Sequence, residues 1–204
     1  MSRSSSQKTE SEKRHLPGLS VLCLFVSAAG ALHLSGTCDL FENNLSGLFY
    51  LQNRQPAVLF FLIPGFSAFG MVSLSAAKNA RQKRAMTLIL LLMILSFLIP
   101  WKENPHGLQS LFNDLHVWLE AAGVLGWSFM MISSLFPPAF SSMALYGIPL
   151  KTKTAAGQLL ILLISILICA LSRHICGEAQ VFFLLASSFW LLIGHSIEKT
   201  GSRN

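Results

Sequence analysis

The stretch "LILLLMILSFLI" (residues 88–99) is an unbroken apolar run interrupted by a single serine. A second run, "LLILLISILI" (159–168), has the same character. Strands of a membrane β-barrel alternate apolar and polar residues, and these runs do not alternate. Such runs are typical of helices that cross a lipid bilayer, because a helix satisfies its backbone hydrogen bonds internally. We therefore expect an all-α, polytopic integral membrane protein.

The composition of the whole chain agrees with this class. Of the 204 residues, 52% are hydrophobic and 12% are charged, whereas about a quarter of the residues in soluble domains are charged. Six apolar runs approach the length of a span, at residues 17–36, 57–77, 85–101, 115–136, 155–172 and 179–197. We expect a six-helix transmembrane domain over 16–198, preceded by a polar, disordered cytoplasmic tail (1–15) and followed by a short cytoplasmic tail (199–204).

Basic residues divide unevenly between the two sides of such a bundle. If the N-terminus is cytoplasmic, twelve basic residues lie inside and three outside, which is the bias that cytoplasmic segments show. The inside residues are Arg3, Lys8, Lys13, Arg14, Lys78, Arg81, Lys83, Arg84, Lys151, Lys153, Lys199 and Arg203, and the outside residues are Arg54, Lys102 and Arg173. We expect both termini in the cytoplasm and a plasma-membrane location, in a bacterium the inner membrane. The dispersed basic residues are topological anchors and not a nucleic-acid surface.

The first apolar run allows a second interpretation. It follows basic residues and ends in Ala29-Gly30-Ala31, a small-residue pattern of the kind cleaved on export. Cleavage there would leave five spans and would not change the orientation of the rest.

Acidic residues, histidines and one arginine collect on the predicted outer side. The candidate site residues among them are His33, Asp114, His116, Glu120, Arg173 and His174. Loops carry charge in any membrane protein, so the loop residues alone do not indicate a site.

Glu120 differs from the loop residues because it lies inside a predicted helix. If that helix begins near Leu115, Glu120 lies about 8 Å below the outer edge, where a carboxylate needs a partner, water or a proton. His116 precedes it by four residues, so the two side chains share a helix face. The same face continues through Gly123 and Trp127, and a glycine lets another helix approach closely. We expect this face inside the bundle.

Three roles fit the His116–Glu120 pair. The two side chains could ligate a divalent metal ion such as zinc, since imidazole and carboxylate are both zinc ligands. Further ligands could come from Asp114, His33 or His174. The pair could instead bind a ligand or relay a proton as acid and base. In the third role Glu120 only hydrogen-bonds His116 or Arg173 and ties helices together, and His-x-x-x-Glu alone does not choose between the roles.

Cys38 and Cys176 both fall on the predicted outer side, where an oxidising exterior could join them in a disulfide. The sequence does not give the distance between them, so the bridge is one possibility. The tripeptide "NLS" (44–46) is a glycosylation sequon, which matters only in a eukaryotic secretory route.

Three stretches occur in a recognisable order: "NNLSGLF" (43–49), "QPAVLFFLIPGFSAFGM" (55–71) and "IPWKENPHGLQSLFNDLHVWLEAAG" (99–123). Over roughly residues 16–197 the chain resembles the bacterial six-helix membrane family called domain of unknown function 998. Where that family commonly has a Ser-Asp pair after its first helix, this chain has Ser46-Gly47. The resemblance implies that His116 is the counterpart of the family's loop histidine. It implies no substrate, because the family has no assigned biochemistry.

The leading functional interpretation is an outward-facing polar pocket that binds or moves a small or lipid-derived ligand. A second is a membrane-embedded hydrolase or transferase for lipid-linked substrates, in which His116 and Glu120 act as acid and base or hold a metal. A third is a non-catalytic subunit of a membrane-protein partner.

Overall fold

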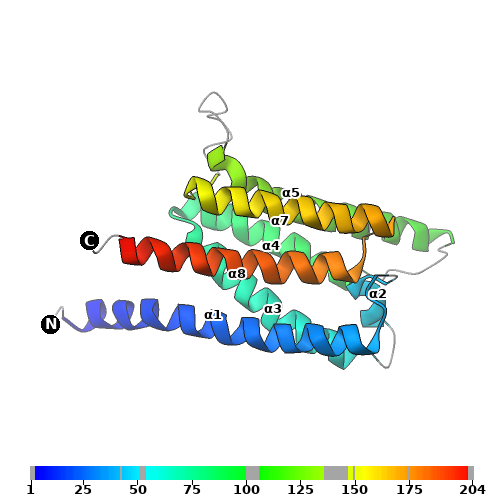
Figure 1. The fold of residues 1–204 in the computed structure, drawn as a ribbon, viewed down its shortest axis with the longest axis horizontal. Coiled ribbons are helices and arrows are strands. Elements are labelled where there is room, and N and C mark those ends of the chain that lie inside the picture. The colour runs from blue at the N-terminus through cyan, green and yellow to red at the C-terminus, as the bar shows by residue number, and fades with distance from the viewer. Residues whose placement is uncertain are drawn as a thin grey trace.

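The computed structural model describes residues 3–41, 43–50, 54–99, 106–135, 147–148, 150–173 and 175–201, and within them the protein is all-α, as expected. The elements are α1 (Arg3–Thr37), α2 (Leu45–Tyr50), α3 (Gln55–Ala76), α4 (Ala80–Leu98), α5 (Leu108–Ile132), the 3₁₀ helix η1 (Ser133–Leu135), α7 (Thr152–Ser172) and α8 (Gly177–Gly201). The long helices lie along one axis, with the start of α1 and the end of α8 at one end of the bundle and α2 at the other (Figure 1).

Five helices in the described ranges are long and apolar enough to cross a membrane. Their apolar parts are Gly18–Thr37, Gln55–Ala76, Leu108–Leu135, Thr152–Ser172 and Gly177–Gly194, which match five of the six predicted runs. The structure is therefore compatible with a multi-pass membrane protein. The remaining run corresponds to α4, whose first turns carry Arg81, Lys83 and Arg84 and so leave a shorter apolar part. A sixth span at α4 stays a prediction.

The first helix begins earlier than the sequence analysis expected. Residues 3–15, expected to be a disordered tail, are the first turns of α1. The sequence is compatible with this, because opposite charges lie four residues apart at Lys8 and Glu12 and at Glu10 and Arg14, a spacing that favours a helix.

The helix that carries His116 and Glu120 is also longer than expected. α5 begins at Leu108 and not near Leu115, directly after Gly107, whose φ is 60°. Glu120 therefore lies about 18 Å along α5 from its first residue, at 1.5 Å per residue. The expected helix start near Leu115 is therefore wrong, and the depth of Glu120 below the outer edge of the membrane stays a prediction.

Small residues bring the helices close together. α1 packs on α3, α4 on α5, and α8 on both α3 and α7. A Cβ atom added to Gly30 of α1 would lie 2.9 Å from the Cα atom of Phe61 in α3, so these two backbones are in contact. Ser27 donates a hydrogen bond of 3.0 Å to the Phe61 carbonyl at the same crossing. The core is completed by Trp127, whose ring centroid lies 4.7 Å from that of Phe69.

Candidate functional site

His116 is the centre of a buried network of polar contacts at the α2 end of the bundle. Its side chain is 1% exposed. The Nδ1 atom lies 2.6 Å from the carbonyl oxygen of Ser96, in the last turn of α4. The Nε2 atom lies 3.1 Å from the hydroxyl oxygen of Ser46 in α2 and 3.4 Å from the Oε2 atom of Glu120. One imidazole ring thus joins α2, α4 and α5.

The partners of His116 restrict where its protons lie. A carbonyl oxygen only accepts hydrogen bonds, so the Nδ1 atom must carry a proton and donate it to Ser96. The Nε2 atom faces both the Ser46 hydroxyl and Glu120 Oε2, so it can either accept a hydrogen bond from Ser46 or donate one toward these oxygens. His116 and Glu120 thus form a buried imidazole–carboxylate pair.

Glu120 is held from its other side by α8. Gln180 donates a hydrogen bond of 2.5 Å from its amide nitrogen to Glu120 Oε1. The amide oxygen of Gln180 accepts from the backbone N–H of Leu45 at 2.8 Å, which fixes the orientation of the amide group. Glu120 Oε2 makes no hydrogen bond to the described residues. The carboxylate is therefore positioned by two helices and keeps one oxygen with unused acceptor capacity.

Residues 43–46, at the start of α2, complete this network of polar contacts. Ser46 donates a hydrogen bond of 3.1 Å to the Asn44 side-chain oxygen, and both side chains are buried. The backbone N–H of Gly177, at the start of α8, donates to the carbonyl of Asn43 at 2.7 Å. This segment is consequently bonded to both α5 and α8.

A cavity of about 380 Å³ lies beside these hydrogen-bonded side chains. Its polar lining residues are Glu120, Gln180, Ser96, Ser165 and Cys169. Its apolar lining comes from α2, α3, α4, α5, α7, α8 and the α7–α8 connection: Leu45, Phe66, Met93, Phe97, Ala121, Val124, Leu125, Leu162, Ile166, Ile175, Ala179, Phe183 and Leu184. Glu120 and Gln180 lie toward α2, whereas Val124 and Leu184, one turn further from α2 on the same helices, are apolar.

The structure brings His116 and Glu120 together but leaves the other predicted residues apart from them. Asp114 and His33 are exposed. Arg173 is exposed at the end of α7, in the left-handed conformation with φ of 63°. His174 lies outside the described residues. Within the described part of the chain, Glu120 thus contacts His116 and Gln180 and not Arg173.

Two candidate ligands of the proposed metal ion, His116 and Glu120, lie close together in the structure. Across the described ranges, no three His, Cys, Asp or Glu side chains gather closely enough to hold an ion. A metal bound at His116 and Glu120 would need further ligands from water, from the ligand or from residues outside those ranges.

The four cysteines are free thiols in the structure. Cys38 is half-buried and Cys176 is buried, and both lie at the α2 end of the bundle. A bridge between them stays a prediction. Asn44 of the sequon is only 4% exposed, so its side chain is not accessible to a glycosyl transferase in this fold.

Comparison of the chain with protein-family models, with curated proteins and with solved structures gives no match. The resemblance to domain of unknown function 998 therefore stays a prediction.

Proposed function

We propose that this protein is a six-helix plasma-membrane protein that binds or moves a lipid-derived ligand with a single apolar chain. In this proposal both termini are cytoplasmic, α4 is the sixth span, and the polar end of the cavity lies toward the outside. The split of twelve basic residues against three supports this orientation. The resemblance to a bacterial family supports an inner-membrane location.

The observation that carries the proposal is the 380 Å³ cavity, whose surface is almost entirely apolar and whose lining residues include Glu120 and Gln180. Ligand sites are commonly mostly apolar, with a few placed polar groups that fix the orientation of the ligand. Glu120 and Gln180 are such groups at one end, and the rest of the lining suits a hydrocarbon chain. A ligand with a polar head and one chain matches both parts.

The charge of the site selects the head group. An anionic head such as a phosphate would face the Glu120 carboxylate and be disfavoured by like charge. We propose instead that a hydroxyl or amino group of the ligand donates a hydrogen bond to Glu120 Oε2, which is buried and has no hydrogen-bond partner among the described residues. We therefore propose a neutral or cationic head that carries such donors.

The same lining supports entry of the ligand from the membrane. Leu125 of α5 and Ile166 of α7 line the cavity and are also exposed on the surface of the bundle. An opening between α5 and α7 would let a lipid chain enter sideways from the hydrocarbon region.

Two adjacent alanines of α5 give a matched test. Ala121 lines the cavity, whereas Ala122 is exposed outside it. The protein is purified in mild detergent and bound lipid is measured by native mass spectrometry, together with a metal analysis of the same samples. We expect Ala121→Phe to lose the bound lipid, because the ring fills the cavity, and Ala122→Phe to keep it.

Equal lipid binding by both variants would contradict the proposal. A wild-type protein without lipid but with a stoichiometric protein partner would favour the non-catalytic subunit. Bound metal would favour the enzyme.

A second function, hydrolase or transferase, is supported by the 3.1 Å contact between the Ser46 hydroxyl and His116 Nε2, which is the distance between a nucleophile and its base. Ser46 is fully buried, however, and does not line the cavity. A fluorophosphonate probe tests this directly. Labelling that disappears in Ser46→Ala would establish a nucleophile, and absence of labelling would leave Ser46 as a bonding partner of His116.

A further inference from the structure

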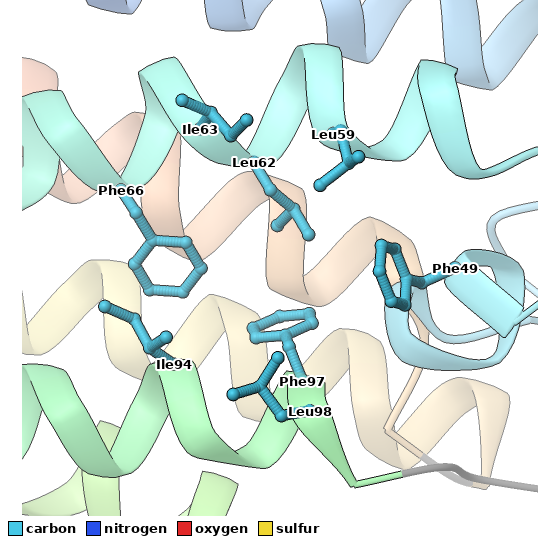
Figure 2. A pocket seen from close by; sticks show the side chains of 8 residues that line it. All are labelled: Phe49, Leu59, Leu62, Ile63, Phe66, Ile94, Phe97 and Leu98. Atoms are coloured by element: carbon cyan, nitrogen blue, oxygen red, sulfur yellow. The ribbon is translucent and has the colours of Figure 1, made fainter.

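A second cavity lies beside the first, between α3 and α4. Its volume is about 250 Å³, and all of its lining residues are apolar. They are Phe49, Leu59, Leu62, Ile63, Phe66, Ile94, Phe97 and Leu98. Figure 2 shows these side chains converging on one space, with Phe49 of α2 at one end of it.

Two aromatic rings separate the two cavities. Phe66 of α3 and Phe97 of α4 line both of them. Their ring centroids are 5.5 Å apart and the ring planes meet at 78°, an edge-to-face arrangement. Figure 2 shows the Phe66 ring and the Phe97 ring side by side between the two helices, one turned across the other. The pair is therefore a wall shared by the polar-ended cavity and the apolar one.

The second cavity has its own access to the surface. Ile63 of α3 and Ile94 of α4 line it and are exposed, as are Leu59 and Leu98. Its exposed lining residues lie on α3 and α4, whereas those of the first cavity, Leu125 and Ile166, lie on α5 and α7. Without the two rings, one apolar passage would cross the bundle.

We propose that Phe66 and Phe97 are specificity-determining residues that set the length of the apolar chain the protein accepts. This inference rests on the proposed function, since it assumes that the chain of a lipid-derived ligand occupies the first cavity. A chain that fits ends against the two rings. A longer chain must displace a ring from its edge-to-face contact to reach the second cavity.

The selection works through fit and not through the hydrophobic effect. A lipid that enters from the bilayer leaves surroundings as apolar as the cavity, so extra methylenes gain little by burial. Forcing extra methylenes into a filled cavity is unfavourable because of overpacking. Removing one ring should relieve the overpacking and improve the binding of the longest chains about tenfold relative to that of short ones.

The test uses a series of monoacylglycerols, whose hydroxyl groups suit Glu120 and Gln180, with chains from decanoyl to stearoyl. Relative affinities are measured by native mass spectrometry in competition on the full-length wild type, Phe97→Ala, Phe66→Ala and Phe97→Leu. The matched control is Phe60→Ala, because Phe60 lies in α3 but is exposed and lines neither cavity. Phe97→Leu keeps an apolar side chain and is available should the alanine variants fold poorly.

We expect the wild type and Phe60→Ala to prefer the shorter chains. The variants at Phe66 and Phe97 should shift the preference to the longest chains by about tenfold. A wild type that binds no member of the series overturns the proposed function and this inference with it. A wild type that binds with an unchanged length profile in the Phe66 and Phe97 variants overturns this inference alone.

Discussion

The Nε2 atom of His116 lies 3.4 Å from the Oε2 atom of Glu120, one turn further along α5, and both side chains are buried. A charge in such surroundings is unfavourable unless a partner or a proton neutralises it. Each group also has a second partner, because the ring is anchored at Ser96 and the carboxylate at Gln180. The stability of each residue is therefore expected to depend on the other.

We predict that Glu120→Gln folds normally and loses ligand. The new side chain can still accept from Gln180 and can donate to a neutral His116, so the free energy of unfolding should change by no more than about 1 kcal/mol. Binding of a hydroxyl-bearing ligand should weaken about tenfold or more, because a charge-assisted hydrogen bond is lost. Thermal unfolding and native mass spectrometry measure the two effects.

The control for this variant is Glu178→Gln, which removes a carboxylate from the exposed start of α8. It should leave ligand binding unchanged. Full binding by a stably folded Glu120→Gln protein would assign Glu120 a purely structural role.

We predict that His116→Ala is strongly destabilising. It leaves the Glu120 carboxylate buried without its imidazole partner and removes the donor to the Ser96 carbonyl, at a combined cost of about 3–5 kcal/mol. Adding Glu120→Gln should recover at least about 1 kcal/mol, because the unpaired buried charge is then gone. Thermal unfolding of the two single variants and the double variant provides the test. Strictly additive effects would contradict the coupling of the two residues.

The face of α5 that carries the site could be predicted from spacing. His116, Glu120, Gly123 and Trp127 recur at three- and four-residue intervals, and all four are buried. Gly123 was expected to admit another helix, and α4 does approach there. The five matched spans follow from the same kind of evidence, continuous apolar runs. These features depend on residues that are close together in the sequence, so they can be predicted from the sequence alone.

The partners that complete the site could not be predicted in the same way. Ser46 lies in a short helix far along the chain from His116, and the Ser96 contact is made by a backbone carbonyl, which no residue pattern marks. Gln180 gave one signal, an amide near the start of an apolar helix, and it was missed. The cavity and its Phe66–Phe97 wall depend on how six helices pack, which is a property of the fold and not of any one helix.

Replacing either of two glycines of α5 by alanine should have opposite effects on stability. A Cβ atom on Gly123 would lie 3.3 Å from the backbone nitrogen of Met93, so Gly123→Ala has to push α4 away and should destabilise the protein by about 1–3 kcal/mol. A Cβ atom on Gly126 would lie 3.4 Å from the tip of Ile89, which can adjust. Gly126→Ala should be neutral, or stabilising by up to about 1 kcal/mol, because alanine favours a helix. Equal melting temperatures for the two variants would contradict the close contact of α4 and α5.

The last prediction concerns α4 and the side of the membrane on which the site opens. Single cysteines are placed at Arg81, at the start of α4, and at Ser110, in the first turn of α5, in a variant that lacks the four native cysteines. Both positions are exposed. The neighbouring Gln82 is unsuitable, because it is 4% exposed and its side chain caps α4 together with Asn79.

If α4 crosses the membrane, it is the single span between these two positions, and the labels must lie on opposite sides. The basic residues around Arg81 favour the cytoplasmic side for it. A membrane-impermeant maleimide should therefore label Ser110→Cys in intact cells and Arg81→Cys only after permeabilisation. Labelling of both cysteines from one side would mean that α4 does not cross. Reversed labelling would place the polar end of the cavity, with Glu120 and Gln180, toward the cytoplasm, where the ligand would have to come from the inner leaflet.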